Sequence, residues 1–303
     1  MNKLSNNIII IIGLSCCLVL LFCFWFIKPL KLSPHPADKQ NISNLPLVEM
    51  QDSFYNREQF FSAIKKADEI IPQSDVYAII VPHHLVGADI IAELIKIASG
   101  RQINTVVVIG PNHENVGREP LASAPVNWQT PEGDLPANVK LEELFLTDNR
   151  LQPNPSALEK EHSVGAIMPF IKHYWPQAQV LPIVLSSYAG KAGAEKLSDW
   201  LKSRLGKNCL VIFSLDFSHY LTKGEADLKD EETKNLIENF LIDKIYNLNN
   251  DYLDSPAGLA TAMLLAQKSG LKVSFIRHSN SFDYAISKPA ATTSYFGIAF
   301  TSE

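Results

Sequence analysis

A short apolar run at residues 106–109, with the sequence VVVI, ends abruptly at Gly110-Pro111-Asn112-His113. β-Branched residues followed at once by turn-forming residues predict a buried strand that stops in a tight turn. Ligands of open α/β sheets bind in the crevice beyond the carboxyl ends of the strands. The pattern therefore predicts that His113 lies at a ligand-binding edge of a sheet.

Strand-like and helix-like segments alternate through most of the chain. This alternation predicts a three-layer αβα fold with a largely parallel central sheet covered by helices on both faces. Residues 114–158 show no sustained period, and we expect them to form a long, irregular and functional loop. The predicted strands are residues 77–81, 106–109, 180–184, 210–213, 273–276 and 295–300, and the predicted helices are residues 58–67, 88–98, 161–171, 192–205, 230–248 and 256–268.

The N-terminal part of the chain has the composition of a membrane anchor. Residues 8–27 are uncharged and almost wholly apolar, which matches the ~20 residues that cross a bilayer as a helix. A cleaved secretory signal has a shorter apolar region and a small-residue cleavage site, and it fits this segment less well. We predict an anchor at residues 1–28, a proline-rich tether at residues 29–47 and one α/β domain at residues 48–303. Lysines flank the anchor on both sides, so charge does not decide its orientation. Because the N-terminal flank is short, we favour an extracytoplasmic domain.

Charge and cysteine usage narrow the class of protein. The formal net charge of -5 gives no basic footprint for nucleic acid, so no nucleic-acid partner is expected. Three of the four cysteines lie in the predicted anchor, and Cys209 is the only thiol beyond it, which excludes a disulfide within the domain. The sequence contains no Gly-x-Ser-x-Gly elbow, Walker A loop or Gly-rich dinucleotide loop.

Side chains that bind metals follow three of the predicted strands. His83 and His84 follow the first, His113 follows the second, and Asp216 and His219 follow a third. Each has an ordinary alternative role, because histidines occur in turns and aspartate is a common helix N-cap. Their shared position at strand ends nevertheless indicates one histidine-rich pocket.

Neutral imidazoles are common ligands of Fe, Cu and Zn, and two histidines with one carboxylate form the facial site of non-haem Fe(II) enzymes. His83 and His113 are the natural pair. His162, in the segment Glu161-His162-Ser163, begins a predicted helix and is either a pocket residue or an ordinary first-turn residue. The residues alone indicate a pocket without specifying a reaction.

Seven segments of the chain occur in the order found in one known family: SFY at 53–55, VPH at 81–83, GPNH at 110–113, WQTPEG at 128–133, EHS at 161–163 with MPF at 168–170, DFSH at 216–219, and SY at 294–295. On these segments the chain resembles the Memo family, also named AmmeMemoRadiSam system protein B. The resemblance implies a fold similar to class III extradiol dioxygenases, whose iron is held by two histidines and a glutamate. It also implies a pocket formed by His83, His113, His219 and Asp216, with a cysteine as a further ligand, and iron or copper binding with redox activity.

The sequence departs from the family pattern at three positions. Asp254, in Leu253-Asp254-Ser255, stands where the family cysteine is expected, which puts a soft copper ligand in doubt. If Asp254 faces the pocket, the site becomes two histidines and a carboxylate. Gly165 stands where the family usually carries a glutamate, and His84 replaces a small residue, adding a ligand or a proton shuttle.

We therefore predict a membrane-anchored, metal-dependent oxidoreductase of an unknown small-molecule substrate, with Fe(II) favoured and Cu or Zn as alternatives. A non-catalytic module that binds a small molecule or peptide on the same fold, and metal-assisted hydrolysis, remain as competing hypotheses. The predicted metal ligands are His83, His113 and Asp254, the predicted proton-transfer groups are His219, His162 and His84, and Asp216 is predicted to orient a ring.

Overall fold

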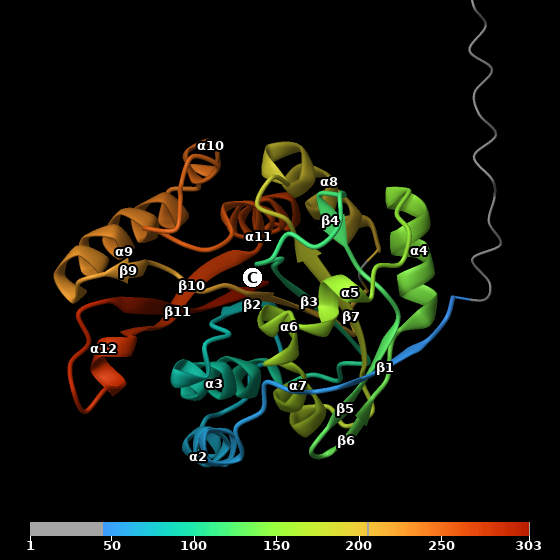
Figure 1. Ribbon diagram of the computed structural model, residues 1–303, viewed down its shortest axis with the longest axis horizontal. Coiled ribbons are helices and arrows are strands. Elements are labelled where there is room, and N and C mark those ends of the chain that lie inside the picture. Colours follow the sequence, from blue (N-terminus) through green and yellow to red (C-terminus); the bar gives the residue numbers. More distant parts are fainter. Residues whose placement is uncertain (1–44, 205, 303) are drawn as a thin grey trace, which may run out of the picture. The chain divides into compact units, whose positions relative to one another are not determined.

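Four parallel strands form the middle of the sheet in the computed structural model, which describes residues 45–204 and 206–302 (Figure 1). Each of these strands is a run of buried, mostly branched side chains, as expected where both faces of a sheet are covered. Their carboxyl ends lie at one edge of the sheet. In spatial order they are β2 (Val76–Val81), β8 (Cys209–Ser214), β3 (Thr105–Pro111) and β7 (Gln179–Leu185).

Antiparallel strands complete the sheet on both sides. β11 (Thr292–Thr301) pairs antiparallel with β2, β10 (Lys272–Asn280) with β11, and β4 (Leu121–Ala122) with β7. The prediction of a largely parallel sheet therefore holds only for the central four strands, and the fold is mixed α/β. β10 and β11 are antiparallel because their connection is short. It holds only the helix α12 (Ser281–Tyr284) and a loop, and a parallel pair would need a longer crossover.

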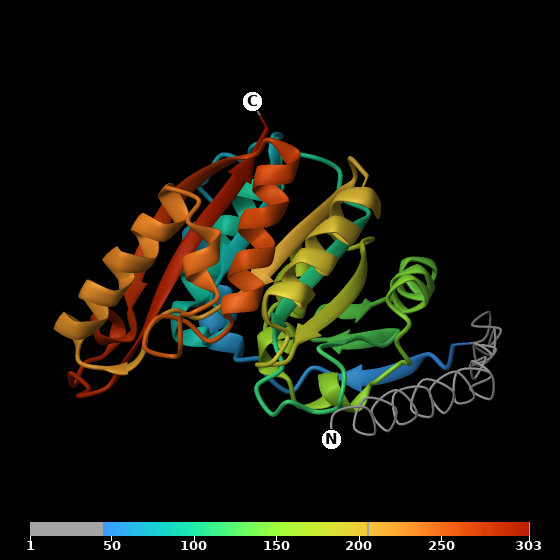
Figure 2. The same ribbon diagram turned by 90° about the horizontal axis from the view of Figure 1, so that it is seen from above.

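Helices cover both faces of the sheet, as the sequence predicted (Figures 1 and 2). Alternate residues of β3 enter two separate cores: Val106 and Val108 pack with one set of helices, and Val107 and Ile109 with the other. One set is α2 (Arg57–Ala67), α3 (Ala88–Ala98), α5 (Ser156–Glu159), α6 (His162–Gly165) and α7 (Met168–Tyr174); the other is α4 (Val139–Asn149), α8 (Gly190–Arg204), α9 (Lys223–Glu238), α10 (Ile242–Ile245) and α11 (Pro256–Ser269).

The segment expected to be one irregular loop, residues 114–158, is instead structured, and that prediction was wrong. It holds β4, α4, α5 and two strands of a second, three-stranded sheet, β5 (Val126–Thr130) and β6 (Gly133–Leu135). The remaining strand of this sheet is β1 (Val48–Gln51), which pairs parallel with β5 in the register Val48↔Val126. A strand whose partner lies so far away along the chain leaves no local signal in the sequence.

Two predicted helices are each divided in two. The helix predicted at residues 230–248 becomes α9 and α10, which are separated near Phe240, a residue with a left-handed φ of 50°. The helix predicted at residues 161–171 becomes α6 and α7, and Pro169 lies in the first turn of α7. Proline is favoured at a helix start, which explains the break.

The predicted anchor at residues 8–27 and nearly all of the predicted tether lie outside the described residues. Within residues 45–204 and 206–302, no helix combines the length and the apolar character that a membrane crossing requires.

Candidate metal centre

Three neighbouring strands deliver the first residues of the site. In the sheet order β2-β8-β3, His83 follows β2, Asp216 follows β8 and His113 follows β3. The parallel registers Val81↔Ser214 and Ile109↔Phe213 place the three strand ends side by side. The sequence predicted that these residues lie at one edge, because the carboxyl ends of parallel strands meet at the same edge of a sheet.

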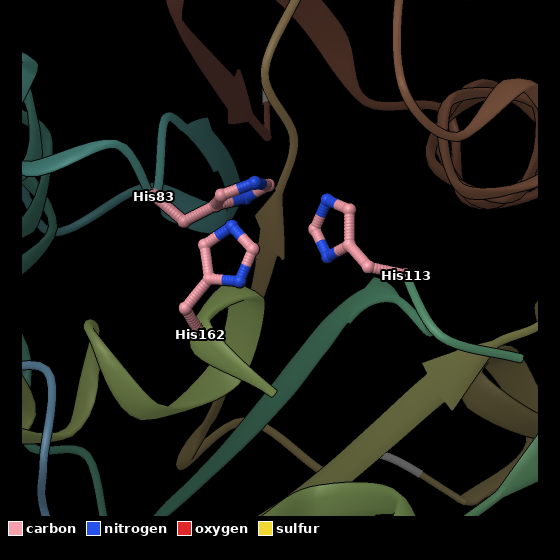
Figure 3. Close-up of side chains that lie close together, drawn as sticks. All are labelled: His83, His113 and His162. Carbon is pink, nitrogen blue, oxygen red and sulfur yellow. The ribbon is translucent and has the colours of Figure 1, made fainter. Parts of the chain in front are cut away.

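The histidine cluster consists of His83, His113 and His162, which each offer a ligand nitrogen, all within 4.8 Å of one another (Figure 3). The rings of His113 and His162 stack with centroids 4.3 Å apart, and the His83 ring is nearly perpendicular to both, at 5.2 and 5.0 Å. His83 is 2% exposed, whereas the side chains of His113 and His162 are 30% and 43% exposed. The cluster is thus anchored in the core on one side and accessible on the other.

His162 reaches the cluster because α6 packs directly on the end of β3. The Ser163 hydroxyl donates to the Pro111 carbonyl at 2.8 Å. A side chain at Gly110 would collide with Ser163, so the absence of a Cβ there is what permits this approach. Gly110, read in the sequence as a turn signal, is thus also a packing requirement for the site.

Glu161 positions the exposed side of the cluster, and it is the functional residue that sequence reasoning missed. One carboxylate oxygen accepts from the His113 backbone N–H at 2.8 Å; the other lies 2.8 Å from His113 Nδ1 and accepts from the Ser163 N–H at 2.9 Å. An ionised carboxylate only accepts, so His113 donates from Nδ1 and keeps the Nε2 lone pair for a ligand. The available signal was an acidic residue directly before a histidine at a helix start.

The charges of this pair support that assignment. Burial raises the pKa of the Glu161 carboxyl, but the hydrogen bond and charge of His113 and the N–H donors of Ser163 and His113 outweigh burial and hold that pKa at about 2. Burial lowers the pKa of His113, but Glu161 outweighs it and the pKa is raised. The carboxylate therefore stays ionised and fixes the ring.

Two buried carboxyl groups face His83. Its Nε2 lies 3.3 Å from Asp254 Oδ2 and 3.6 Å from Asp216 Oδ2, and its backbone N–H donates to Asp216 Oδ1 at 3.0 Å. Burial, and then the neighbouring Asp216, raise the pKa of Asp254 well above its ordinary value. Burial, and then the charges of His113 and His162, lower the pKa of His83 well below its ordinary value. His83 is therefore neutral, which is the form that binds metal ions.

Asp254, for which the sequence left the orientation open, does face the pocket. Its Oδ2 accepts from the Asp216 backbone N–H at 3.0 Å, and its Oδ1 is buried without a hydrogen-bond partner. Orphaned buried carboxylate oxygens are uncommon in native proteins, which makes Asp254 Oδ1 a candidate ligand atom.

The two other predicted residues lie beside the cluster. His84 Nδ1 hydrogen-bonds the Tyr295 hydroxyl at 2.7 Å. Burial raises the pKa of Asp216, and the charges of His219 and His84 and the His84 backbone N–H act against this shift. His219 opens β9 (His219–Leu221), and its Nδ1 is buried without a partner. Burial lowers the pKa of His219, although the Asp216 charge opposes this shift.

The space beside Gly165 is filled by an aromatic ring. A Cβ at this position would come within 2.6 Å of Phe54 Cδ2, and the same phenyl ring lies 5.9 Å from the imidazole of His162. The segment after β1 therefore reaches the site and packs where the family pattern predicts an acidic side chain.

A polar cavity of about 620 Å³ adjoins the cluster, and both His113 and Asp254 contribute to its wall. Its other walls come from the segments after β3 and β7 and from the loop before α11. Of the three clustered histidines only His113 lines this cavity, so a small molecule there would meet the cluster at His113.

Fold and site together define a mixed α/β protein with a candidate three-histidine metal centre beyond the ends of its parallel strands. The family model described as Memo-like protein matches residues 53–298. The chain belongs to the Memo-like family, which confirms the family predicted from the sequence.

Relatives with the printed name MEMO1 family protein extend over most of the domain. The protein of Desulfurococcus amylolyticus is 27% identical over 224 residues, covering 70% of this chain and 79% of the relative. That of Methanosarcina mazei is 30% identical over 199 residues, covering 62% and 73%. That of Caldivirga maquilingensis is 28% identical over 236 residues, covering 74% and 83%.

Proposed function

We propose that this chain is a metal-dependent oxidoreductase that acts on a small molecule. The observation that carries the proposal is the group of three histidine nitrogens within 4.8 Å of one another, one buried and two accessible, beside a cavity. We assign His83, His113 and His162 as the nitrogen ligands. Compared with the ligand set predicted from the sequence, this assignment adds His162.

The donor atoms fit a hard or intermediate divalent ion. Asp254 offers an unpartnered carboxylate oxygen next to His83, and Glu161 directs the Nε2 of His113 toward the group. Cys209 is the only free cysteine in the part of the chain that the structure describes, and it starts β8, at the opposite end of the strands from the site. Imidazole with carboxylate and no thiolate favours Fe(II), with Cu or Zn as alternatives.

The resemblance to class III extradiol dioxygenases supports redox chemistry. A metal ion bound here would supply a redox-active or Lewis-acidic centre. The protein itself would hold the ligand nitrogens in place through Glu161 and Asp216, and exclude water around buried His83. We assign proton transfer to His219, whose unpartnered Nδ1 is available, and retain His84 as a proton shuttle because it is paired with the Tyr295 hydroxyl.

The test is the metal content of the full-length protein, purified from reducing, iron-replete medium, with His113→Ala beside it. We expect stoichiometric metal in the wild type and its loss in the variant. His173→Ala is the matched control, because His173 is a partly exposed histidine paired with Glu132 at 2.9 Å, outside the cluster. Wild-type protein that is folded by circular dichroism but contains no metal would refute the proposal. It would favour the competing hypothesis of a non-catalytic module that binds a small molecule or peptide.

We also propose that residues 8–27 anchor the protein in a membrane and that the domain lies on the extracytoplasmic side. Their uninterrupted apolar character supports an anchor, and the lysines on both flanks leave the orientation to experiment. A reporter fused to the C-terminus, active on only one side of the membrane, tests the orientation. Recovery of the intact chain in the soluble fraction would contradict the anchor.

A further inference from the structure

The wall of the polar cavity combines apolar side chains with neutral hydrogen-bonding groups, two carboxyl groups and the imidazole of His113. Neither lysine nor arginine is among the described residues that line it, while Asp251 and Asp254 are. A volume of about 620 Å³ is within the range of small-molecule sites. The neutral side chains on the wall include those of Asn115, Ser186, Ser187, Asn249, Asn250 and Tyr246.

Two polar atoms of lining residues are buried and lack a partner. One is the Tyr246 hydroxyl and the other is Asp254 Oδ1. Tyr246 ends α10, where its ring packs against the core on the α8 and α11 side of the sheet. Asp254 Oδ1 is the oxygen offered to the metal ion above. Most buried polar atoms in native proteins are hydrogen-bonded, so the Tyr246 hydroxyl indicates a hydrogen bond that a ligand in the cavity completes.

The charges at the wall disfavour anions. A carboxylate or phosphate in the cavity would face Asp251 and Asp254, and the one basic side chain among the described wall residues, His113, is already paired with Glu161 at 2.8 Å. The ammonium of Lys191, near the Tyr246 ring, is already paired with Asp243 at 2.8 Å. At the start of α11, the Ser255 hydroxyl accepts from the Gly258 N–H and Pro256 has no N–H, so this helix N-terminus offers few free donors.

We propose that the cavity binds an uncharged molecule with several hydroxyl groups, a sugar or polyol, with Tyr246 as the specificity-determining group. The neutral amides and hydroxyls of the wall both donate to and accept from hydroxyl groups. The exclusion of amines rests on the proposed function, because a divalent ion at the histidine cluster would offset the carboxyl groups of Asp251 and Asp254 and leave neither an amine nor an anion an unpaired opposite charge. The cavity would then present hydroxyl groups of this ligand to the accessible side of the cluster.

The test compares three charge states of one scaffold by ligand-observed NMR with the full-length protein. The probes are glucose, glucose 6-phosphate and glucosamine, with myo-inositol as a second neutral polyol. We expect both neutral probes to bind, the phosphate and the amine to bind at least severalfold more weakly, and Tyr246→Phe to weaken the neutral probes about tenfold.

Tyr174→Phe is the matched control, because the Tyr174 hydroxyl is also buried without a partner but packs with the core on the other face of the sheet. It should leave binding unchanged, and metal content, measured in parallel, should be unchanged in both variants. Tighter binding of the phosphate, equal binding by Tyr246→Phe and wild type, or no binding of either neutral probe would overturn the proposal. Binding of neutral probes to metal-free protein would support the ligand class while the proposed function fails.

Discussion

A buried acid far from the strand ends provides a sharp test of the electrostatics of the fold. Glu142 lies in the first turn of α4, is 0% exposed, and neither of its carboxylate oxygens has a hydrogen-bond partner. The neighbouring Ser123 hydroxyl donates to the Pro182 carbonyl instead. Burial raises the pKa of Glu142 from 4.5 to about 8.

The size of the effect follows from the difference between the two pKa values. The folded protein keeps the proton up to about pH 8, whereas the unfolded chain releases it near 4.5. Between these values the folded state binds more protons, so the free energy of unfolding falls as pH rises, by about 1.4 kcal/mol per pH unit at most. Across the whole window this amounts to about 5 kcal/mol.

We therefore expect Glu142→Gln to gain stability relative to the wild type as pH rises from 5 to 8. The assay is urea unfolding of the full-length protein at a series of pH values, with the difference between variant and wild type plotted against pH. Taking the difference removes the titrations that both proteins share. Glu143→Gln, at the neighbouring and more exposed position, is the control and should give a flat difference. A flat difference for Glu142→Gln would refute a buried, neutral carboxyl.

Three further substitutions test contacts around the site. Glu161→Gln, which removes the carboxylate that fixes the His113 ring, should weaken metal binding by about 10–100-fold in a metal titration, without loss of fold. Gly165→Ala, whose Cβ would meet Phe54 at 2.6 Å, should cost about 1–2 kcal/mol in urea unfolding, and Phe54→Ala in the same chain should remove that extra cost. Asp230→Ala should cost about 2–4 kcal/mol, because buried Asp230 accepts from Ser218 at 2.7 Å and bonds His278 Nε2 at 2.8 Å; a cost below 1 kcal/mol would contradict this.

The central strands and the strand-end residues could be predicted because their signals are local. Runs of branched apolar residues marked β2, β3, β7 and β8, and the rule that parallel strands end at one edge placed His83, His113 and Asp216 together. No distance information was needed for that step. The same rule left the antiparallel edges undetermined, because strand direction at an edge depends on the length of the connection.

The rest of the site depends on packing between distant segments. His162 joins the cluster because Ser163 bonds Pro111, a contact across 52 positions. Likewise, β1 pairs with β5 and carries the following residue Phe54 to Gly165. Neither contact leaves a local pattern in the sequence. The sequence therefore identified His162 as a candidate but did not identify Glu161 as the group that orients His113.

Two departures from the family pattern change the donor groups beside the histidines. Gly165 leaves the phenyl ring of Phe54 in contact with the backbone near His162, and no acidic side chain is present at this position. Asp254 places a carboxylate near His83 where a cysteine was expected. Relative to the family pattern, a carboxylate is therefore absent beside His162 and present beside His83, and the thiol is absent. The net result is a harder set of donors, which shifts the proposed preference from copper toward Fe(II) and is tested directly by which metal the purified protein retains.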